Sequence, residues 1–77
     1  MNKIILPELG EGIESATIAC WHIKKGDRVK RDDDVVELTT DKATFNVSAE
    51  TSGVIKDIFF KEGQEVKIGA TLAVVES

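Results

Sequence analysis

Residues 35–47 read VVELTTDKATFNV, two runs of strand-forming residues on either side of Asp41-Lys42. Val, Leu, Thr and Phe favour the pleated, half-buried surface of a sheet, and a short polar pair between two such runs is typical of a hairpin turn. We therefore predict a β-hairpin with a tight turn at this pair. The amine of Lys42 would then stand at the tip, where another protein can reach it.

Strand-like runs continue along the rest of the chain, and turn signals separate them at short intervals. The turns fall at Gly10-Glu11-Gly12, Lys25-Gly26-Asp27, Glu50 to Gly53, Glu62-Gly63-Gln64 and Ile68-Gly69-Ala70. We expect strands near residues 3–6, 16–23, 28–30, 35–39, 43–48, 53–60, 65–67 and 72–76. No segment keeps a helical hydrophobic period over three turns, so the pattern predicts an all-β sandwich or barrel.

The chain has 77 residues, the size of one small domain, and we assign residues 1–77 to it. Its single cysteine, Cys20, excludes an internal disulfide, and no Cys/His cluster offers a structural metal site. Stability must then come from a small apolar core and from leaving few sheet edges unpaired. Both requirements favour a closed or sandwiched sheet.

The net charge of −4 argues against nucleic-acid binding, which requires Lys and Arg to neutralise phosphates. Basic residues between positions 24 and 31 run directly into Asp32-Asp33-Asp34, and we interpret this mixed stretch as solvated surface. No apolar run approaches the roughly 20 residues of a membrane span. Because the strand-like residues 3–6 follow the start almost at once, we expect no signal segment and a reducing compartment.

The chain resembles itself when it is shifted by 37 positions. Residues 15–18 fall on 52–55, 24–26 on 61–63, 29–30 on 66–67 and 35–38 on 72–75, with six identities over residues 15–30. We interpret the repeat as two similar halves and expect a pseudo-two-fold pair of sheets; chance similarity between two hairpins is the alternative. If the halves are equivalent, the chain ends take the place of a second lysine hairpin and lie opposite Lys42.

Other chemistry-bearing residues lack partners. His22 has no second histidine to complete a ligand set, and the serines have no evident base to activate them. We interpret Cys20 as a small, partly buried strand residue rather than a redox thiol. One presented amine without catalytic equipment indicates a carrier rather than a catalyst.

Several motifs follow one another over essentially the whole chain. They are Leu6-Pro7-Glu8-Leu9-Gly10-Glu11-Gly12-Ile13, the run around Trp21, Lys25-Gly26-Asp27 with Val29, Thr40-Asp41-Lys42-Ala43, and Gly53-Val54-Ile55 with Glu62-Gly63. Together they resemble the lipoyl domain of the acyltransferase component of 2-oxo acid dehydrogenase complexes. The resemblance implies a flattened β-barrel, or barrel-sandwich hybrid, of two four-stranded antiparallel sheets. It also implies a monomeric isolated domain in the bacterial cytoplasm or the mitochondrial matrix.

The resemblance implies lipoic acid in amide linkage to Lys42, which removes the charge of the lysine. Asp41 and Ala43 would complete the attachment turn: Asp41 by bonding neighbouring backbone amides, Ala43 by leaving room beside the amine. The family often has Glu three residues before the lysine and Gly eleven after it. Gly53 fits this pattern, whereas Thr39 departs from it and leaves the efficiency of lipoylation by a given ligase open.

The resemblance also implies partners. A thiamine-dependent 2-oxo acid decarboxylase loads the lipoyl ring, the acyltransferase core passes the acyl group to coenzyme A, and dihydrolipoyl dehydrogenase reoxidises the ring. A lipoate ligase or lipoyl transferase attaches the group. Glu8, Glu11 and Glu14 make residues 8–14 an acidic loop, which by resemblance lies near the lysine and helps the decarboxylase recognise its carrier; an ordinary solvated loop is the alternative. Residues 9–13 and 41–44 lean toward a pyruvate complex, with a branched-chain complex next, rather than a 2-oxoglutarate complex.

Two other interpretations compete with that of a lipoyl domain. A biotinyl carrier domain of a carboxylase shares the architecture but flanks its lysine with methionines, whereas the only methionine here is Met1. An unmodified hairpin-sandwich domain acting as a structural adaptor would have no need of Asp-Lys-Ala at the tip.

Overall fold

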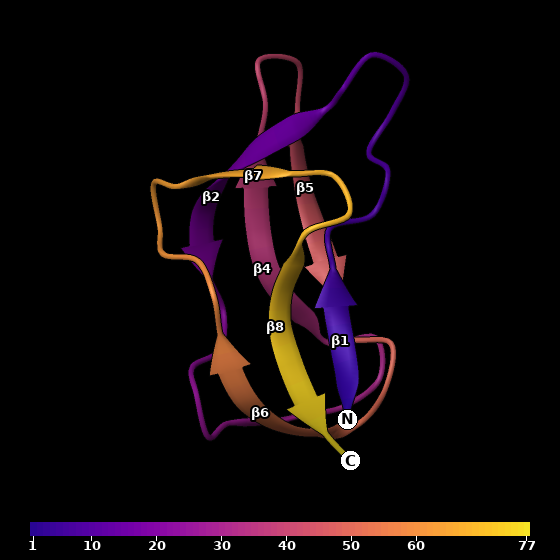
Figure 1. Ribbon diagram of the computed structural model, residues 1–77, viewed down its shortest axis with the longest axis vertical. Coiled ribbons are helices and arrows are strands. Elements are labelled where there is room, and N and C mark those ends of the chain that lie inside the picture. The colour runs from indigo at the N-terminus through magenta and orange to yellow at the C-terminus, as the bar shows by residue number, and fades with distance from the viewer.

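The computed structural model describes residues 1–77 and contains eight β-strands and no α-helix (Figure 1). The strands are β1 (Asn2–Ile5), β2 (Ser15–Trp21), β3 (Arg28–Val29), β4 (Asp34–Thr39), β5 (Thr44–Ser48), β6 (Gly53–Ile58), β7 (Glu65–Lys67) and β8 (Thr71–Glu76). All the strands expected from the sequence are present, with ends that differ by at most two residues. No helix in the structure is long and apolar enough to cross a membrane.

The strands form two antiparallel sheets of four strands each. Their orders are β1-β8-β6-β3 and β5-β4-β2-β7. All the strand pairs are antiparallel, as the predicted barrel-sandwich fold requires. Of the edge strands β1, β3, β5 and β7, the strands β3 and β7 are only two and three residues long, so they expose little unpaired backbone.

The predicted internal repeat is present in the structure. A shift of 37 residues carries β2, β3 and β4 onto β6, β7 and β8, and each strand lands at the equivalent place in the other sheet. Backbone hydrogen bonds repeat as well: Gly26 N donates to Ile55 O and Gly63 N donates to Ile18 O, both at 2.8 Å. Chance similarity between two hairpins would not reproduce such bonds, so the two halves are structural equivalents.

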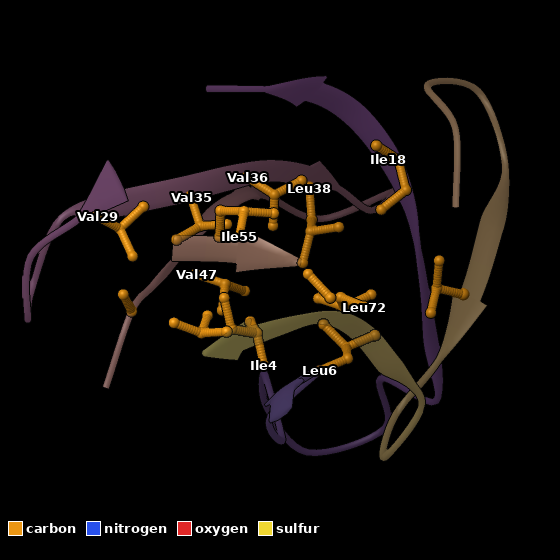
Figure 2. Packing of buried hydrophobic residues seen from close by; sticks show 14 of the residues in the cluster. Ile4, Leu6, Ile18, Val29, Val35, Val36, Leu38, Val47, Ile55 and Leu72 are labelled. Carbon is orange, nitrogen blue, oxygen red and sulfur yellow. The ribbon is translucent and has the colours of Figure 1, made fainter. Parts of the chain in front are cut away.

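A single apolar core lies between the sheets (Figure 2). It consists of fifteen buried residues, all apolar, and no buried side-chain polar atom lacks a partner. Several core residues are repeat partners, such as Ile18 with Ile55 and Val29 with Val66. Burying apolar surface contributes about 25 cal/mol per Å², so this shared core is the main force that holds the two sheets together.

The chain ends and the β4–β5 hairpin occupy opposite ends of the long axis (Figure 1). The molecule measures 33 × 21 × 17 Å, and the termini leave from β1 and β8, which pair with each other. The hairpin projects past the sheets at the other end. The arrangement expected from the repeat, with both ends far from Lys42, is therefore observed.

Gly53, the first residue of β6, packs closely against the last residues of β8. A Cβ at this position would collide with the backbone oxygen of Glu76 and come within 2.7 Å of Val75 Cγ1. In the other half the equivalent position is Ala16, whose methyl group fits in the core with 3% of the residue exposed. The backbone of β8 therefore lies too close to Gly53 for a side chain there, and only glycine leaves room for this approach.

We expect Gly53→Ala to lower the free energy of unfolding by about 1–3 kcal/mol, because the obstructing atom belongs to the backbone and cannot rotate away. Urea denaturation followed by circular dichroism measures the change. Lys3→Ala, at an exposed position on the other neighbour of β8 and without an ion pair, serves as the control and should alter stability by less than about 0.5 kcal/mol. Equal stability of Gly53→Ala and the wild type would show that β6 and β8 are not in such close contact.

Candidate functional site

The turn between β4 and β5 presents Asp41 and Lys42 at its tip. The last paired residues of the two strands are Thr39 and Thr44. Beyond them, the backbone N–H of Thr40 donates to Ala43 O at 2.8 Å and closes the turn. Neither tip residue has a positive φ, so the turn is built without glycine. The predicted hairpin and the position of Lys42 at its tip are both observed.

The hydroxyl group of Thr40 organises this turn. Its Oγ1 accepts hydrogen bonds from Lys42 N at 3.2 Å and from Ala43 N at 3.1 Å, and it donates to Ala43 O at 3.1 Å. We expected Asp41 to bond the neighbouring amides, and this prediction is wrong, because the Asp41 carboxylate forms no hydrogen bond. Thr and Asp can both cap a turn, and here Thr40, one position before Asp41, has the amides within reach.

The side chain of Lys42 is free. It is exposed and forms neither an ion pair nor a hydrogen bond; the salt bridge of the molecule joins Lys56 to Glu76 at 3.6 Å, near the C-terminus. Ala43 beside it is also exposed and adds only a methyl group. An activated acyl donor can therefore approach the Lys42 amine without displacing any partner.

A shallow groove of about 460 Å³ runs beside the hairpin. Hydroxyl and carboxylate groups dominate its lining, which consists of Gly12, Ile13, Glu14, Ser15, Ala16, Thr17, Thr39, Thr40, Asp41, Lys42 and Glu65. Ser15 Oγ donates to Glu65 Oε2 at 2.8 Å, from β2 to the neighbouring strand β7. The groove joins the hairpin to the start of β2 and to β7, so the surface around Lys42 is made by segments that are distant in sequence.

The loop between β1 and β2 rises to the same end of the molecule as the hairpin (Figure 1). Glu14 lies in the groove lining, and its backbone oxygen accepts a hydrogen bond from Ile68 N at 3.0 Å. Glu8 and Glu11 are exposed earlier in the loop and do not line the groove. Of the three acidic residues singled out in the sequence, the structure thus brings Glu14 into the same groove as Lys42.

The remaining polar candidates form ordinary local contacts. Trp21 Nε1 donates to Phe60 O at 2.9 Å, and the half-buried Cys20 lies with its Sγ 3.6 Å from Trp21 O. His22 Nε2 lies 3.2 Å from Asn46 Oδ1 on the outer surface. No three His, Cys, Asp or Glu side chains lie close enough to hold a metal ion.

Residues 2–75 match the model of the biotin/lipoyl family, whose description is "Biotin-requiring enzyme". Among solved structures, the lipoyl domain of the 2-oxoglutarate dehydrogenase complex of Azotobacter vinelandii covers 100% of this chain and 98% of that one, with a TM-score of 0.80 and 39% identity. The urea carboxylase of Kluyveromyces lactis shares the fold over 96% of this chain and 6% of its own, with a TM-score of 0.79 and 24% identity.

Curated relatives point in the same direction. The dihydrolipoyllysine-residue succinyltransferase component of the 2-oxoglutarate dehydrogenase complex of Rickettsia conorii is 48% identical over 87% of this chain and 17% of its own length. The protein of the same description from Staphylococcus saprophyticus is 40% identical over 97% of this chain and 18% of its own. The chain thus spans less than a fifth of these relatives.

The lean toward a pyruvate or branched-chain complex finds no support in these relatives, whose descriptions specify 2-oxoglutarate. The residues on which the lean was based have a structural explanation. Positions 41–44 are set by the turn and the start of β5, and Gly10 and Gly12 adopt φ values of 156° and 81° in the loop. Such residues report on the shape of the chain and not on the partner.

We expect Asp41→Ala to change the free energy of unfolding by less than about 0.5 kcal/mol, since the carboxylate bonds nothing. Asp33→Ala is the matched comparison, because Asp33 Oδ2 accepts a hydrogen bond from Lys30 N at 2.9 Å in another turn. This variant should lose about 0.5–1.5 kcal/mol. A larger loss for Asp41→Ala than for Asp33→Ala, measured by chemical denaturation, would mean that Asp41 supports the lysine turn after all.

Proposed function

This chain belongs to the biotin/lipoyl attachment family as one of its lipoyl domains, and we propose that Lys42 is the residue that carries the lipoyl group. The observation that supports the assignment is the free, exposed amine at the tip of the β4–β5 hairpin. The tip has no obstructing side chain, because Ala43 follows the lysine. A long acyl chain attached there would extend into solvent, away from the core.

Attachment requires only the nucleophile from this chain. The neutral amine of Lys42 attacks the carboxyl carbon of an acyl adenylate that a lipoate ligase prepares; a C–N bond forms, the bond to the adenylate breaks, and a proton passes to solvent. The resulting amide no longer carries the lysine charge. The domain itself is a carrier and supplies no catalytic group.

When bound, the lipoyl group supplies a disulfide that accepts an acyl group together with two electrons and from which the acyl group is then transferred to coenzyme A. The protein contributes geometry. The hairpin holds the attachment point about as far from the chain ends as the 33 Å length allows. A domain tethered through these ends presents its arm to several active sites at high effective concentration.

We propose that the domain serves the dihydrolipoyl succinyltransferase of a 2-oxoglutarate dehydrogenase complex. The descriptions of its relatives support this choice over a pyruvate or branched-chain complex. Its partners would be the 2-oxoglutarate decarboxylase, dihydrolipoyl dehydrogenase, the acyltransferase core and the lipoate ligase. Glu8, Glu11 and Glu14 are proposed as part of the surface that the decarboxylase recognises, since their loop reaches the hairpin end of the molecule.

The biotin-carrier and adaptor interpretations are not favoured. The likeness to a urea carboxylase is at 24% identity and concerns the fold alone. No methionine flanks Lys42, and the relatives named above are acyltransferase components.

Coexpression with both lipoate and biotin ligases, each supplied with its cofactor, tests the site directly. The intact mass of the wild type should increase by one lipoyl group. Lys42→Arg should gain none, because the guanidinium group stays protonated near neutral pH and is not a nucleophile. Lys25→Arg, a change at another exposed lysine, should be modified like the wild type. A lipoyl adduct on Lys42→Arg, or a biotinyl adduct on the wild type, would refute the assignment.

Reductive acylation of the lipoylated domain tests the choice of complex. The rate with the 2-oxoglutarate decarboxylase should exceed the rates with the pyruvate and branched-chain decarboxylases by at least about tenfold, a difference of roughly 1.4 kcal/mol in transition-state free energy. The triple variant Glu8→Gln, Glu11→Gln, Glu14→Gln should reduce the preferred reaction and make it less sensitive to salt. Faster acylation by the pyruvate decarboxylase would overturn the proposed 2-oxoglutarate complex. An unchanged rate for the triple variant would show that the decarboxylase does not recognise the acidic loop.

A further inference from the structure

The turn that carries Lys42 is held by few interactions. Sheet pairing ends at Thr39 and Thr44, and one backbone hydrogen bond, from Thr40 N to Ala43 O, continues beyond them. The other hydrogen bonds within the turn all involve the Thr40 hydroxyl group. The two amides that this oxygen accepts are those of Lys42 itself and of the next residue.

Thr40 has a side chain that suits this arrangement. A hydroxyl group donates one hydrogen bond and accepts two, and here all three are used. A carboxylate at position 40 could accept from the amides but could not donate to Ala43 O. A side chain without polar atoms would leave the Lys42 and Ala43 amides to solvent, with the turn closed by a single backbone bond.

We propose that Thr40 is the positioning residue of the attachment turn, fixing the backbone of Lys42 in the form that the lipoate-attaching enzyme binds. This inference rests on the proposed attachment of lipoate to Lys42. A turn already in its bound form binds without further ordering, whereas a loosened turn must be ordered at the moment of binding. The effect of Thr40 should therefore appear in the KM of the ligase for the domain and leave kcat nearly unchanged.

The kinetic experiment uses lipoate ligase with saturating lipoate and ATP and with the unmodified domain as the varied substrate. Thr40→Val, which keeps the shape but removes the hydroxyl, should raise KM about tenfold with little change in kcat. Thr40→Ser should restore a KM close to that of the wild type. Thr44→Val is the matched control, since Thr44 is an exposed threonine of the same hairpin whose side chain forms no hydrogen bond.

The outcomes separate the two proposals. A wild type that gains no lipoyl group at Lys42 overturns the proposed function. A wild type that is modified, together with Thr40→Val of unchanged KM or with Thr44→Val as impaired as Thr40→Val, overturns the positioning role of Thr40. A fall in kcat without a change in KM also overturns it, because a loosened turn affects binding.

Amide hydrogen exchange of the unmodified wild type provides a measurement that does not depend on whether a variant folds. The Lys42 and Ala43 amides should exchange more slowly than the Asp41 amide, which has no hydrogen-bond partner in the same turn. In folded Thr40→Val the first two amides should exchange as fast as that of Asp41, and in Thr40→Ser they should remain protected. Equal exchange of all three amides in the wild type would overturn the inference.

Discussion

Each half of the chain supplies an edge strand to the sheet of the other half. The strand β3, from the first half, pairs with β6, and β7, from the second half, pairs with β2. The turns that lead into these strands donate hydrogen bonds across the same junctions, from Gly26 to Ile55 and from Gly63 to Ile18. Neither half can complete a sheet alone, so the core forms only when the two halves exchange strands.

The site lies where the two-fold repeat is broken. The repeat places the chain ends and the β4–β5 hairpin at equivalent positions, and only the hairpin connects its two strands. Its tip contributes nothing to the core, since residues 41 to 44 are all exposed. Core packing therefore places no demand on the tip, whose residues need only suit the turn and attachment, while the repeated strands maintain the fold.

Much of the molecule could be predicted from the sequence because its signals are local. Runs of Val, Ile and Thr between glycine-containing turns gave the strands, and the polar pair Asp41-Lys42 gave the hairpin tip. The role of Thr40 could not be predicted, because Thr and Asp both cap turns, and which of them reaches the amides depends on the turn geometry. The sequence marked Gly53 only through a turn signal and the family pattern, and the physical reason for a glycine there could not be predicted, since the obstruction comes from Glu76, far along the chain.

The expected preference for a pyruvate or branched-chain complex lacks support for a different reason. The motifs used for it describe a loop and a turn that the fold itself requires, whereas a partner can contact only exposed side chains, such as those of Glu14 and Glu65 in the groove lining. No strand or turn pattern in the sequence identifies these positions. A sequence pattern that specifies shape therefore identifies the family and leaves the partner undecided.

The pairing of β1 with β8 places the first and last strands side by side and antiparallel, from Asn2 opposite Val75 to Ile5 opposite Thr71. A force that pulls the two chain ends apart would open this pair from its end, one hydrogen bond after another, like a zipper. Such opening needs little force at each step and begins at the end of the molecule away from Lys42. Mechanical strain on a tethered domain would thus be relieved at its base before it disturbs the hairpin.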